Sequence, residues 1–345
     1  MKALRWHARG DVRLDDVPPP GVPRPGEVQL RVLWCGLCGT DYEEYRHGPI
    51  FIPTSPHPLT GAAAPLTLGH EVVGVVTKVP PGGRLDPGST VAVDGLSFCG
   101  QCRNCRRHRV TLCDKLASIG LMGDGGLAEL VNVPELGCVV LPDSLSPEAA
   151  TLAETLAVGV RALRRGRLLA GERVAVVGAG PVGLLAAQAA RAMGASRVSV
   201  CDPLAERQKM ALTLGASEAG GPGALPGLDA DLVLECSGAP GTLADAVAAA
   251  DRAGRVVLVG ITARPAPLDV LSVVTGEREI IGSLSHVYDE DFAGAVAMLA
   301  AGAVEAGPLI TARIPLTAAL GRGLLALGHP AADQVKIIVS PEPGR

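Results

Sequence analysis

Residues 173–202 read RVAVVGAGPVGLLAAQAARAMGASRVSVCD, and this stretch decides the fold. It opens with four apolar residues rich in β-branching, at 174–177, which predict a strand buried on both faces. A Gly-x-Gly-x-x-Gly turn follows, and residues 184–193 after it are helix-forming and largely apolar. This turn between a strand and a helix indicates a dinucleotide-binding site, whereas a chance glycine-rich turn would not need those flanks.

The residues of the turn have separate roles. Gly178 allows the tight turn, Gly180 lets the backbone approach a pyrophosphate, and Gly183 lets the helix pack close to the strand. Pro181 and Val182 start the helix, where free N–H groups would face the phosphates. We therefore predict that these five residues bind the cofactor.

Asp202 ends the second strand of the stretch and stands 19 residues after Gly183. An acid at this place can accept hydrogen bonds from an adenosine ribose and would repel a 2′-phosphate, which favours NAD over NADP. Arg207 follows about one turn into the next helix, and an arginine there could instead hold a 2′-phosphate.

The composition excludes several classes of protein. The 345 residues are 48% hydrophobic with a net charge of −4, which leaves no basic surface for nucleic acid or a membrane. No apolar run reaches the roughly 18 residues of a membrane span, and the charged start Met1-Lys2-Ala3-Leu4-Arg5 predicts no secretory signal. We therefore expect a cytoplasmic protein, in which nine cysteines indicate metal binding or catalysis rather than disulfides.

Two segments of different texture predict two domains, as the length suggests. The first 150 residues or so predict short strands broken by Gly and Pro, including an alternating strand at 28–35, in an all-β, barrel-like segment. From residue 146 onward strands alternate with helices, which predicts an α/β domain with a doubly wound parallel sheet of about six strands. The predicted helices in this part include 147–163, 243–253, 291–301 and 317–326.

Four cysteines lie close together in the sequence. Cys99, Cys102 and Cys105 are spaced Cys-x-x-Cys-x-x-Cys, and seven residues separate them from Cys113. Four thiolates can fill every position around a tetrahedral zinc, and such a closed site is structural. We predict that this zinc fixes a polar, glycine-rich lobe at residues 95–114; redox use of the paired cysteines is the alternative.

Other metal-ligating residues are scattered, as in a catalytic site. Cys38 lies in Cys-Gly-Leu-Cys-Gly-Thr-Asp, and His70 and Glu71 lie in Leu-Gly-His-Glu before a strand. Glu154 lies on the helix that enters the second domain. A thiolate, an imidazole and a carboxylate can hold zinc with a fourth position open to water or substrate. Taken singly, Cys38 could be a core residue and Glu154 a solvated acid; we expect Cys35, on the same strand as Cys38, to be core.

Together these motifs resemble those of the zinc-dependent medium-chain alcohol dehydrogenases, in the family's order and approximate spacing over the whole chain. Within this family the N-terminal third resembles the 2,3-butanediol dehydrogenases most. The matching pieces are MKALRWH at residues 1–7, GPIFIP at 48–53 and HPLT at 57–60.

The resemblance implies a domain organisation. A GroES-like β-barrel catalytic domain would cover residues 1–152, and a Rossmann NAD-binding domain would cover residues 153–287. Residues 288–345 would return to the catalytic domain. We also expect two zinc ions per chain and a homo-oligomer, either a dimer or a tetramer.

The resemblance also implies roles for individual residues. Cys38, His70 and Glu154 would be ligands of the catalytic zinc, with Glu71 beside the metal as an alternate ligand. Asp41 would accept a hydrogen bond from His70 and fix its orientation, and Thr40 would pass on the substrate proton. We predict further cofactor contacts at Val259, Ile261 and Ser283.

The chain departs from the family in two places. The family usually has His two residues after the Asp, completing a proton relay, where this chain has Glu43; it often has Pro after the zinc-binding Glu, where this chain has Thr155. Glu43 is either a relay base or a solvated loop acid, and its neighbour Glu44 favours the second, as a charged surface pair.

These assignments predict an NAD-linked zinc oxidoreductase of secondary alcohols or vicinal diols, with 2,3-butanediol and acetoin as the leading pair. In the resembled enzymes zinc lowers the pKa of the alcohol oxygen and the nicotinamide accepts hydride. The same-class alternatives are a polyol (sorbitol-like) dehydrogenase and a specialised biosynthetic alcohol dehydrogenase or reductase. A binding protein without turnover is disfavoured by the complete ligand set, and a zinc-ribbon nucleic-acid module by the lack of basic and aromatic surface.

Overall fold

The structure is a computed structural model that describes residues 1–224, 227–262, 265–328 and 334–342. The chain forms two compact units. Unit 1 comprises Met1–Glu154, Val287–Val296 and Ala306–Arg345, and unit 2 comprises Thr155–His286 and Ala297–Glu305. The chain thus leaves unit 1 at residue 154 and returns to it after residue 286, apart from one short segment.

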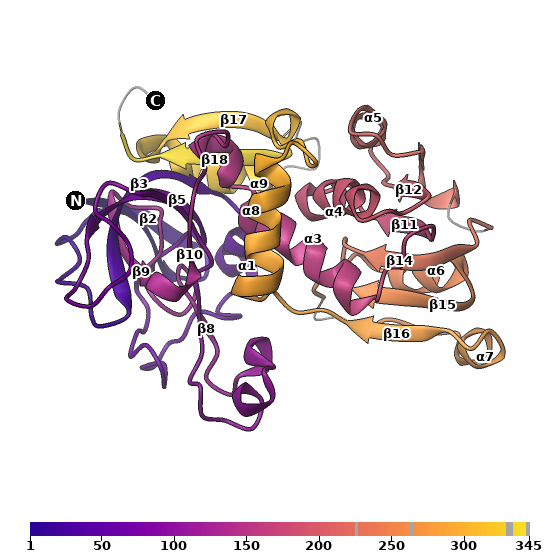
Figure 1. The fold of residues 1–345 in the computed structure, drawn as a ribbon, viewed down its shortest axis with the longest axis horizontal. Helices are drawn as coiled ribbons and strands as arrows, with labels where there is room; N and C mark the ends of the chain where they lie inside the picture. The colour runs from indigo at the N-terminus through magenta and orange to yellow at the C-terminus, as the bar shows by residue number, and fades with distance from the viewer. Residues whose placement is uncertain (225–226, 263–264, 329–333, 343–345) are drawn as a thin grey trace. The chain divides into compact units, whose positions relative to one another are not determined.

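Unit 1 is built mainly from antiparallel strands (Figure 1). One sheet has the order β2-β1-β4 and consists of β1 (Lys2–Ala8), β2 (Asp11–Asp16) and β4 (Leu66–Thr67). The larger sheet has the order β10-β6-β5-β3-β18-β17, with β9 pairing with β3. Its strands are β3 (Glu27–Gly36), β5 (Glu71–Lys78), β6 (Thr90–Val93), β9 (Leu130–Pro134), β10 (Cys138–Val140), β17 (Ile310–Pro315) and β18 (Lys336–Ser340). The short strands β7 (Leu96–Ser97) and β8 (Ala117–Ser118) pair beside the cysteine lobe.

Strand β3 crosses the core of unit 1 and confirms the strand predicted at residues 28–35, but its burial does not follow the alternation of the sequence. All its residues except Glu27 and Arg31 are buried. The loop at Pro20 contacts one position of this strand, where the Gln29 side chain donates to the carbonyls of Pro20 and Gly21 at 3.3 and 3.4 Å.

The strand also ends before Cys38, contrary to the prediction. Cys35 is on β3 and is fully buried, so its prediction as a core residue is confirmed. Cys38 instead is the N-cap of α1 (Gly39–His47), with extended backbone angles. The position of Cys38 is therefore set by the start of α1 and not by strand β3.

Unit 2 contains a six-stranded parallel sheet in the order β13-β12-β11-β14-β15-β16. Its strands are β11 (Arg173–Val177), β12 (Arg197–Cys201), β13 (Glu218–Gly220), β14 (Ala230–Glu235), β15 (Ala250–Leu258) and β16 (Glu279–Gly282). The accompanying helices are α4 (Pro181–Ala192), α5 (Ala205–Thr213), α6 (Thr242–Ala249) and α7 (Val270–Thr275), and α3 (Ala153–Arg165) leads into the unit. The strand order reverses between β11 and β14, so the predicted doubly wound α/β sheet is confirmed.

The helix predicted at 243–253 is too long. Helix α6 ends at Ala249, and β15 begins at Ala250. At this point the chain pairs with β14, where Ala250 is opposite Ala230. The Asp251 carboxylate next to it accepts a hydrogen bond at 2.9 Å from Arg173 on β11. Ala253, with φ +57°, turns the chain within the new strand.

The helix predicted at 317–326 is largely replaced by other turns. A 3₁₀ turn covers Leu316–Ala318, a π-helical segment covers Ala319–Leu324, and α9 covers only Leu325–Leu327. Gly323 packs so closely that a Cβ there would lie 2.5 Å from Leu37 Cδ1, and glycine is a poor helix former.

Of two further predicted helices, one is divided and the other begins with a π-helical turn. The one at 147–163 is divided into α2 (Pro147–Ala150) and α3, and in the one at 291–301 a π-helical turn at Tyr288–Phe292 precedes α8 (Ala293–Ala300). Within the described ranges, no helix has both the length and the apolar character needed to cross a membrane.

Candidate active site and metal centres

Three candidate metal ligands come together in unit 1. Cys38 caps α1, and His70 and Glu71 lie where the chain enters β5. One ligand atom from each lies within 4.8 Å of those of the other two. Cys38 is half-buried, and His70 and Glu71 are buried. A thiolate, an imidazole and a carboxylate in buried surroundings form a donor set that suits zinc, so these residues fit the metal.

Gly69 allows His70 to take this place. Its φ is +97°, and a Cβ on it would lie 2.6 Å from Cys35 Sγ and 2.8 Å from Leu127 N. Only glycine fits such a position without displacing backbone.

Asp41 supports the cluster from α1. Its Oδ2 accepts a hydrogen bond from the Cys38 N–H at 2.9 Å, and its Oδ1 lies 3.7 Å from His70 Nδ1. Both of these last two atoms are buried without a hydrogen-bond partner among the described residues. The two atoms of the predicted Asp41–His70 contact are therefore close, but they are farther apart than in a hydrogen bond.

The charges around His70 are those of a cation site. Burial lowers the pKa of His70, but the negative charges of Asp41, Cys38 and Glu154 outweigh burial, and the pKa lies well above its usual value. For Asp41, which is an acid, burial has the opposite effect and raises the pKa. The excess of acidic groups in a buried place agrees with binding of a metal cation.

Thr40 and Glu154 lie at the edge of this cluster. Thr40 Oγ1 is 3.6 Å from Cys38 Sγ. Glu154 is half-buried in the first turn of α3, and its charge acts on His70. It is not one of the three residues whose ligand atoms lie within 4.8 Å of one another.

Glu43 and Glu44 differ although they are adjacent. The Glu43 side chain is 54% exposed and lies 3.9 Å from His47. Glu44 is fully buried, and its carboxylate accepts hydrogen bonds from the three successive N–H groups of residues 50–52. The predicted charged surface pair is therefore wrong for Glu44, because α1 turns this residue inward to hold the loop that follows.

Sequence reasoning missed Lys336, which is 1% exposed on β18. Its Nζ donates to Glu71 Oε1 and Oε2 at 2.6 and 2.7 Å. The available signal was a lone lysine within the apolar run of residues 335–339, because a charge inside a buried strand needs a partner.

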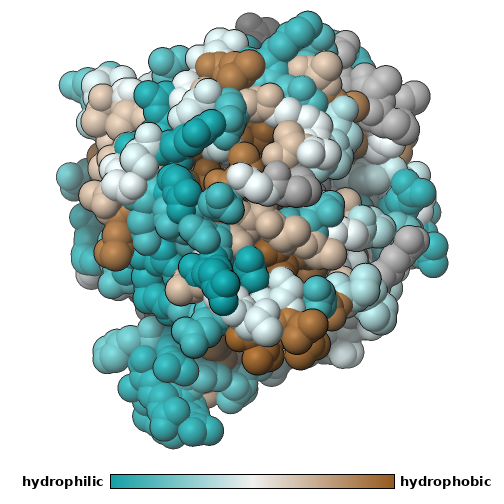
Figure 2. All heavy atoms as spheres, turned by 90° about the vertical axis from the view of Figure 1, so that its right-hand side faces the viewer, coloured by the Kyte–Doolittle hydropathy of each residue, from teal (hydrophilic) through white to brown (hydrophobic). Residues whose placement is uncertain are grey.

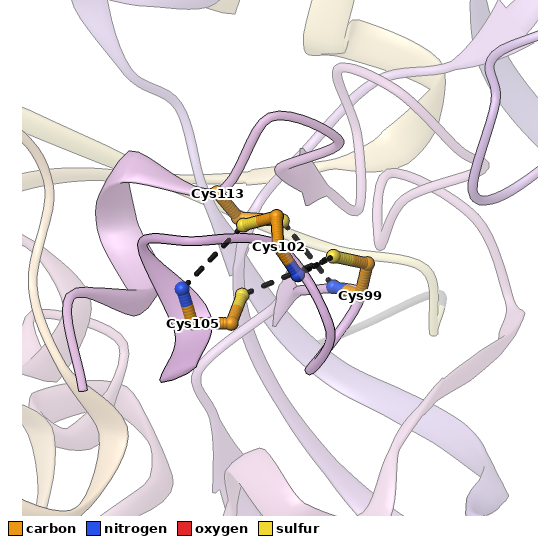
Figure 3. A group of neighbouring side chains, drawn as sticks. All are labelled: Cys99, Cys102, Cys105 and Cys113. Carbon is orange, nitrogen blue, oxygen red and sulfur yellow. Dashed lines mark hydrogen bonds between the residues drawn. The ribbon is translucent and has the colours of Figure 1, made fainter. Parts of the chain in front are cut away.

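The four cysteines of the lobe face one another (Figure 3). Their sulfur atoms lie within 4.8 Å of one another, on the segment that projects below β8 in Figure 1. The Cys102 and Cys105 N–H groups donate to the Cys99 and Cys102 sulfurs, each at 3.4 Å, and Cys113 Sγ accepts from the Cys99 N–H at 3.3 Å. Four sulfurs with backbone donors aimed at them fit a closed zinc site.

Two of the four thiols differ in their pKa. Backbone N–H groups, that of Cys105 foremost, lower the pKa of Cys102 to about 6, whereas burial raises the pKa of Cys105 to about 12. Zinc binds thiolates, so metal binding at neutral pH would release the proton of Cys105.

The glycine turn lies at the carboxyl edge of the sheet in unit 2. Gly178 has φ +100°, and a Cβ on Gly183 would lie 1.8 Å from Gly178 O. Gly180 is the N-cap of α4, followed by Pro181 and Val182, and a Cβ on Gly180 would meet no atom within 4 Å. Open space before the first N–H groups of a helix is what a pyrophosphate needs, so the turn fits a dinucleotide.

Asp202 contacts this turn. Its Oδ2 accepts the Ala179 N–H at 2.8 Å, and its Oδ1 accepts the Leu204 N–H at 2.9 Å. Arg207, in the first turn of α5, donates to the Ala179 carbonyl at 3.5 Å. Burial lowers the pKa of Arg207, and the Asp202 charge opposes that shift. An acid and an arginine therefore lie together beside the turn.

The remaining predicted cofactor residues follow the last two strands of the sheet. The Val259 N–H donates to the Glu235 carbonyl at 2.8 Å, and the Ser283 N–H donates to the Leu258 carbonyl at 3.0 Å. Ile261 is 67% exposed.

Glu235, at the end of β14, is a second buried charge that sequence reasoning missed. Its Oε1 accepts hydrogen bonds from the N–H groups of Ser237 and Gly238 at 3.0 and 2.9 Å. Gly260 packs against the same loop, since a Cβ on it would lie 2.2 Å from Gly238 N. Glu235 therefore fixes the loop next to the glycine turn.

Comparison with known proteins shows which families the chain resembles. The family model for the alcohol dehydrogenase GroES-like domain matches residues 24–143, and that for zinc-binding dehydrogenases matches residues 181–301. The (R,R)-butanediol dehydrogenase of Bacillus subtilis (strain 168) is 35% identical over 359 residues, covering 99% of this chain and 100% of that protein. The crystal structure of 2R,3R-butanediol dehydrogenase from Bacillus subtilis is 34% identical with a TM-score of 0.91, covering 99% of each chain.

Two further relatives differ in the substrate or the cofactor of their names. The sorbitol dehydrogenase of Macaca fascicularis is 33% identical over 334 residues, covering 92% of this chain and 90% of that protein. A zinc-binding dehydrogenase structure from Sinorhizobium meliloti, described as putative and bound to NADP, is 29% identical with a TM-score of 0.88, covering 99% of each chain.

These likenesses extend over nearly the whole chain, so they include the segments of the metal ligands and of the glycine turn. The chain is an oxidoreductase whose cofactors are zinc and a nicotinamide dinucleotide. It belongs to the zinc-dependent medium-chain alcohol dehydrogenases.

Proposed function

We propose that this enzyme oxidises a secondary alcohol or vicinal diol with NAD and reduces the ketone in the opposite direction. 2,3-Butanediol and acetoin are the leading substrate pair. The observation that carries the proposal is the cluster of half-buried Cys38 with buried His70 and Glu71, in a chain whose butanediol dehydrogenase relatives are 34–35% identical over nearly full length.

Two zinc ions per chain are part of the proposal. Cys38, His70 and Glu154 would hold the catalytic zinc, with Glu71 as an alternate ligand, and the four lobe cysteines would hold the structural one. Zinc bound at the first site supplies a Lewis acid that lowers the pKa of an alcohol oxygen.

The protein's own residues orient ligands and move a proton. Asp41 Oδ1, 3.7 Å from His70 Nδ1, would fix the imidazole and leave its other nitrogen for the metal. The Thr40 hydroxyl, beside Cys38, would accept the substrate proton. The exposure of Glu43 supports a relay that continues from Thr40 to water or the cofactor ribose rather than through Glu43.

For the cofactor we propose NAD rather than NADP. The glycine turn, Val259, Ile261 and Ser283 would line its site, and Asp202 would accept hydrogen bonds from the ribose. Arg207 lies close enough to Asp202 for their charges to interact. Because one similar structure is bound to NADP, the activities with NAD and with NADP have to be compared.

A polyol dehydrogenase is the second candidate, favoured by the 33% identity with a sorbitol dehydrogenase. Steady-state rates of the zinc-loaded enzyme with 2,3-butanediol, sorbitol and simple secondary alcohols, each with NAD and NADP, separate the two. We expect the highest kcat/KM with 2,3-butanediol and NAD. A higher kcat/KM with sorbitol would replace the diol proposal by the polyol one.

We further propose a homo-oligomer in the cytoplasm. The support for assembly lies on unit 2, where β16 is an edge strand and α7 exposes Val270, Leu271 and Val274. Figure 2 views this side of the chain and shows brown apolar atoms in several places, one group of them low in the view. Light scattering measures the mass in solution, and a monomer would contradict this part of the proposal.

A further inference from the structure

The backbone just before His70 is held by one segment that is distant in sequence. Three successive carbonyls, at residues 67–69, accept hydrogen bonds from three successive N–H groups, at residues 125–127. The bonds run from Gly125 to Thr67, from Gly126 to Gly69 and from Leu127 to Leu68, at 2.9, 2.8 and 2.9 Å. Thr67 is tied a second time, because its own N–H donates to Asp124 Oδ1 at 2.8 Å. This segment therefore fixes the peptide groups that lead into His70.

Glycine at position 125 lets the two backbones lie this close. A Cβ on Gly125 would lie 2.2 Å from Gly69 O and 2.7 Å from Leu68 O. Gly120 packs on the same peptide, since a Cβ on it would lie 2.5 Å from Gly69 O. These obstructing atoms belong to the main chain and cannot rotate away as the end of a side chain could. The φ of Gly125 is outside the left-handed range, so glycine is needed here only for the close approach.

The segment is a firm support because both of its ends are tied. The Ile119 N–H donates to the carbonyl of Gly95 at 3.1 Å, beside the pairing of β7 with β8 at the base of the cysteine lobe. At the other end, the Leu127 carbonyl accepts a hydrogen bond from Leu4 N on β1 at 2.8 Å. We therefore expect a clash at Gly125 to be relieved by a shift of residues 68–70.

Such a shift would act on the candidate metal site. His70 and Cys38 are held by different elements, since His70 precedes β5 and Cys38 caps α1. Their ligand atoms lie within 4.8 Å of each other. Zinc bonds to nitrogen and sulfur have narrow lengths, about 2.0–2.1 and 2.3 Å. The distance between these two ligands therefore depends on what holds each backbone.

We propose that Gly125 is a positioning residue for the candidate catalytic zinc. Its contact with the carbonyls of Leu68 and Gly69 fixes the backbone that places the His70 imidazole at the distance from Cys38 that the metal needs. Gly125 itself ligates nothing and acts through this backbone. The inference rests on the zinc site of the proposed function.

Release of zinc to excess chelator, followed with a zinc-sensitive dye, tests the proposal. The catalytic-site phase is identified as the one missing from Cys38→Ser. Gly125→Ala should speed this phase about 10-fold or more, the scale of effects of residues that support metal ligands. The phase of the cysteine lobe should stay within about two-fold of wild type, which a general loss of stability would not leave unchanged.

Gly123→Ala is the matched control, two residues away in the same segment. Among the described residues, a Cβ on Gly123 would meet Thr60 Cγ2 alone, at 4.0 Å. Both phases of zinc release should therefore keep their wild-type rates in Gly123→Ala.

Asp124→Ala carries the test if Gly125→Ala does not fold, because it removes atoms at an exposed position. Loss of the hydrogen bond from Thr67 N should speed the catalytic-site phase about three-fold or more. Asp124→Asn keeps Oδ1 and should restore the rate.

Three results would count against these expectations. An unchanged catalytic-site phase in folded Gly125→Ala overturns the proposal, as does equal acceleration of both phases. If Gly125→Ala does not fold, an unchanged phase in Asp124→Ala overturns it. Absence of the catalytic-site phase from wild type refutes the zinc site itself, and the inference with it.

Discussion

Glu44 and Glu43 offer a matched pair of substitutions, because one is buried and the adjacent one is exposed on the same helix. Glu44→Gln replaces a carboxylate whose Oε2 accepts from Ile50 N and whose Oε1 accepts from the next two amides. A Gln side chain keeps one oxygen and turns an NH₂ group toward the remaining N–H. A hydrogen bond to a charged acceptor contributes about 1.5–3 kcal/mol, so we expect the loop to lose about 2–3 kcal/mol.

Hydrogen exchange measures this loss locally, which suits a chain of two units whose global unfolding need not be two-state. A loss of 2–3 kcal/mol corresponds to amide exchange roughly 30- to 150-fold faster at residues 50–52. Glu43→Gln should change the free energy of local opening, as measured by exchange, by less than about 0.5 kcal/mol, as expected of a surface substitution. Equal effects of the two substitutions, or no effect of Glu44→Gln, would refute the role of Glu44.

The same control tests the proton relay. Glu43→Gln should leave kcat within a few-fold of wild type, because its side chain is solvated, whereas Thr40→Val should be severely impaired. A loss of roughly 10²-fold or more in Glu43→Gln with zinc content intact is the size expected of a general base. That result would place Glu43 in the relay.

Three further predictions concern the cofactor, the lobe and an ion pair. Asp202→Asn should raise the KM for NAD about 10-fold and lower that for NADP, since it removes the charge from the ribose position; higher kcat/KM with NADP in the wild type would contradict the role of Asp202. Cys105→Ser should remove one zinc per chain and lower the unfolding temperature, because apparent zinc-binding free energies in such lobes are on the order of 10 kcal/mol; an unchanged zinc content would refute the site. The hydrogen bond from Arg173 lowers the pKa of Asp231, so Asp231→Asn should cost about 1 kcal/mol of stability in chemical unfolding at pH 7. A lowered pKa stabilises the fold above the unfolded value and is lost as pH falls through the folded one, so the difference from wild type should shrink below about pH 4; a constant difference would contradict it.

The features that could be predicted from the sequence are formed by residues close together in the chain. The glycine turn and the four-cysteine run each lie within a short segment, and their spacing alone indicates the geometry that the structure has around Gly178, Gly183 and Cys102. The parallel sheet of unit 2 follows from the alternation of strands and helices, because crossover connections leave few other arrangements.

What could not be predicted depends on partners far apart in the chain. Lys336 and Glu71 are separated by 265 residues and meet only through the pairing of three strands. Glu44 resembles a surface acid in sequence, and only the loop that folds back over α1 buries it. Likewise β15 begins where a helix was predicted, since Ala250 pairs with Ala230 on another strand.

Zinc content and turnover measured in the same preparations test the central claim most directly. Wild-type protein should hold two zinc ions per chain and form NADH from 2,3-butanediol and NAD. Cys38→Ser should hold one and form none, because it keeps only the four-cysteine site. Cys38→Ser with full zinc content and wild-type turnover, or a fully active wild type with one zinc, would contradict the account.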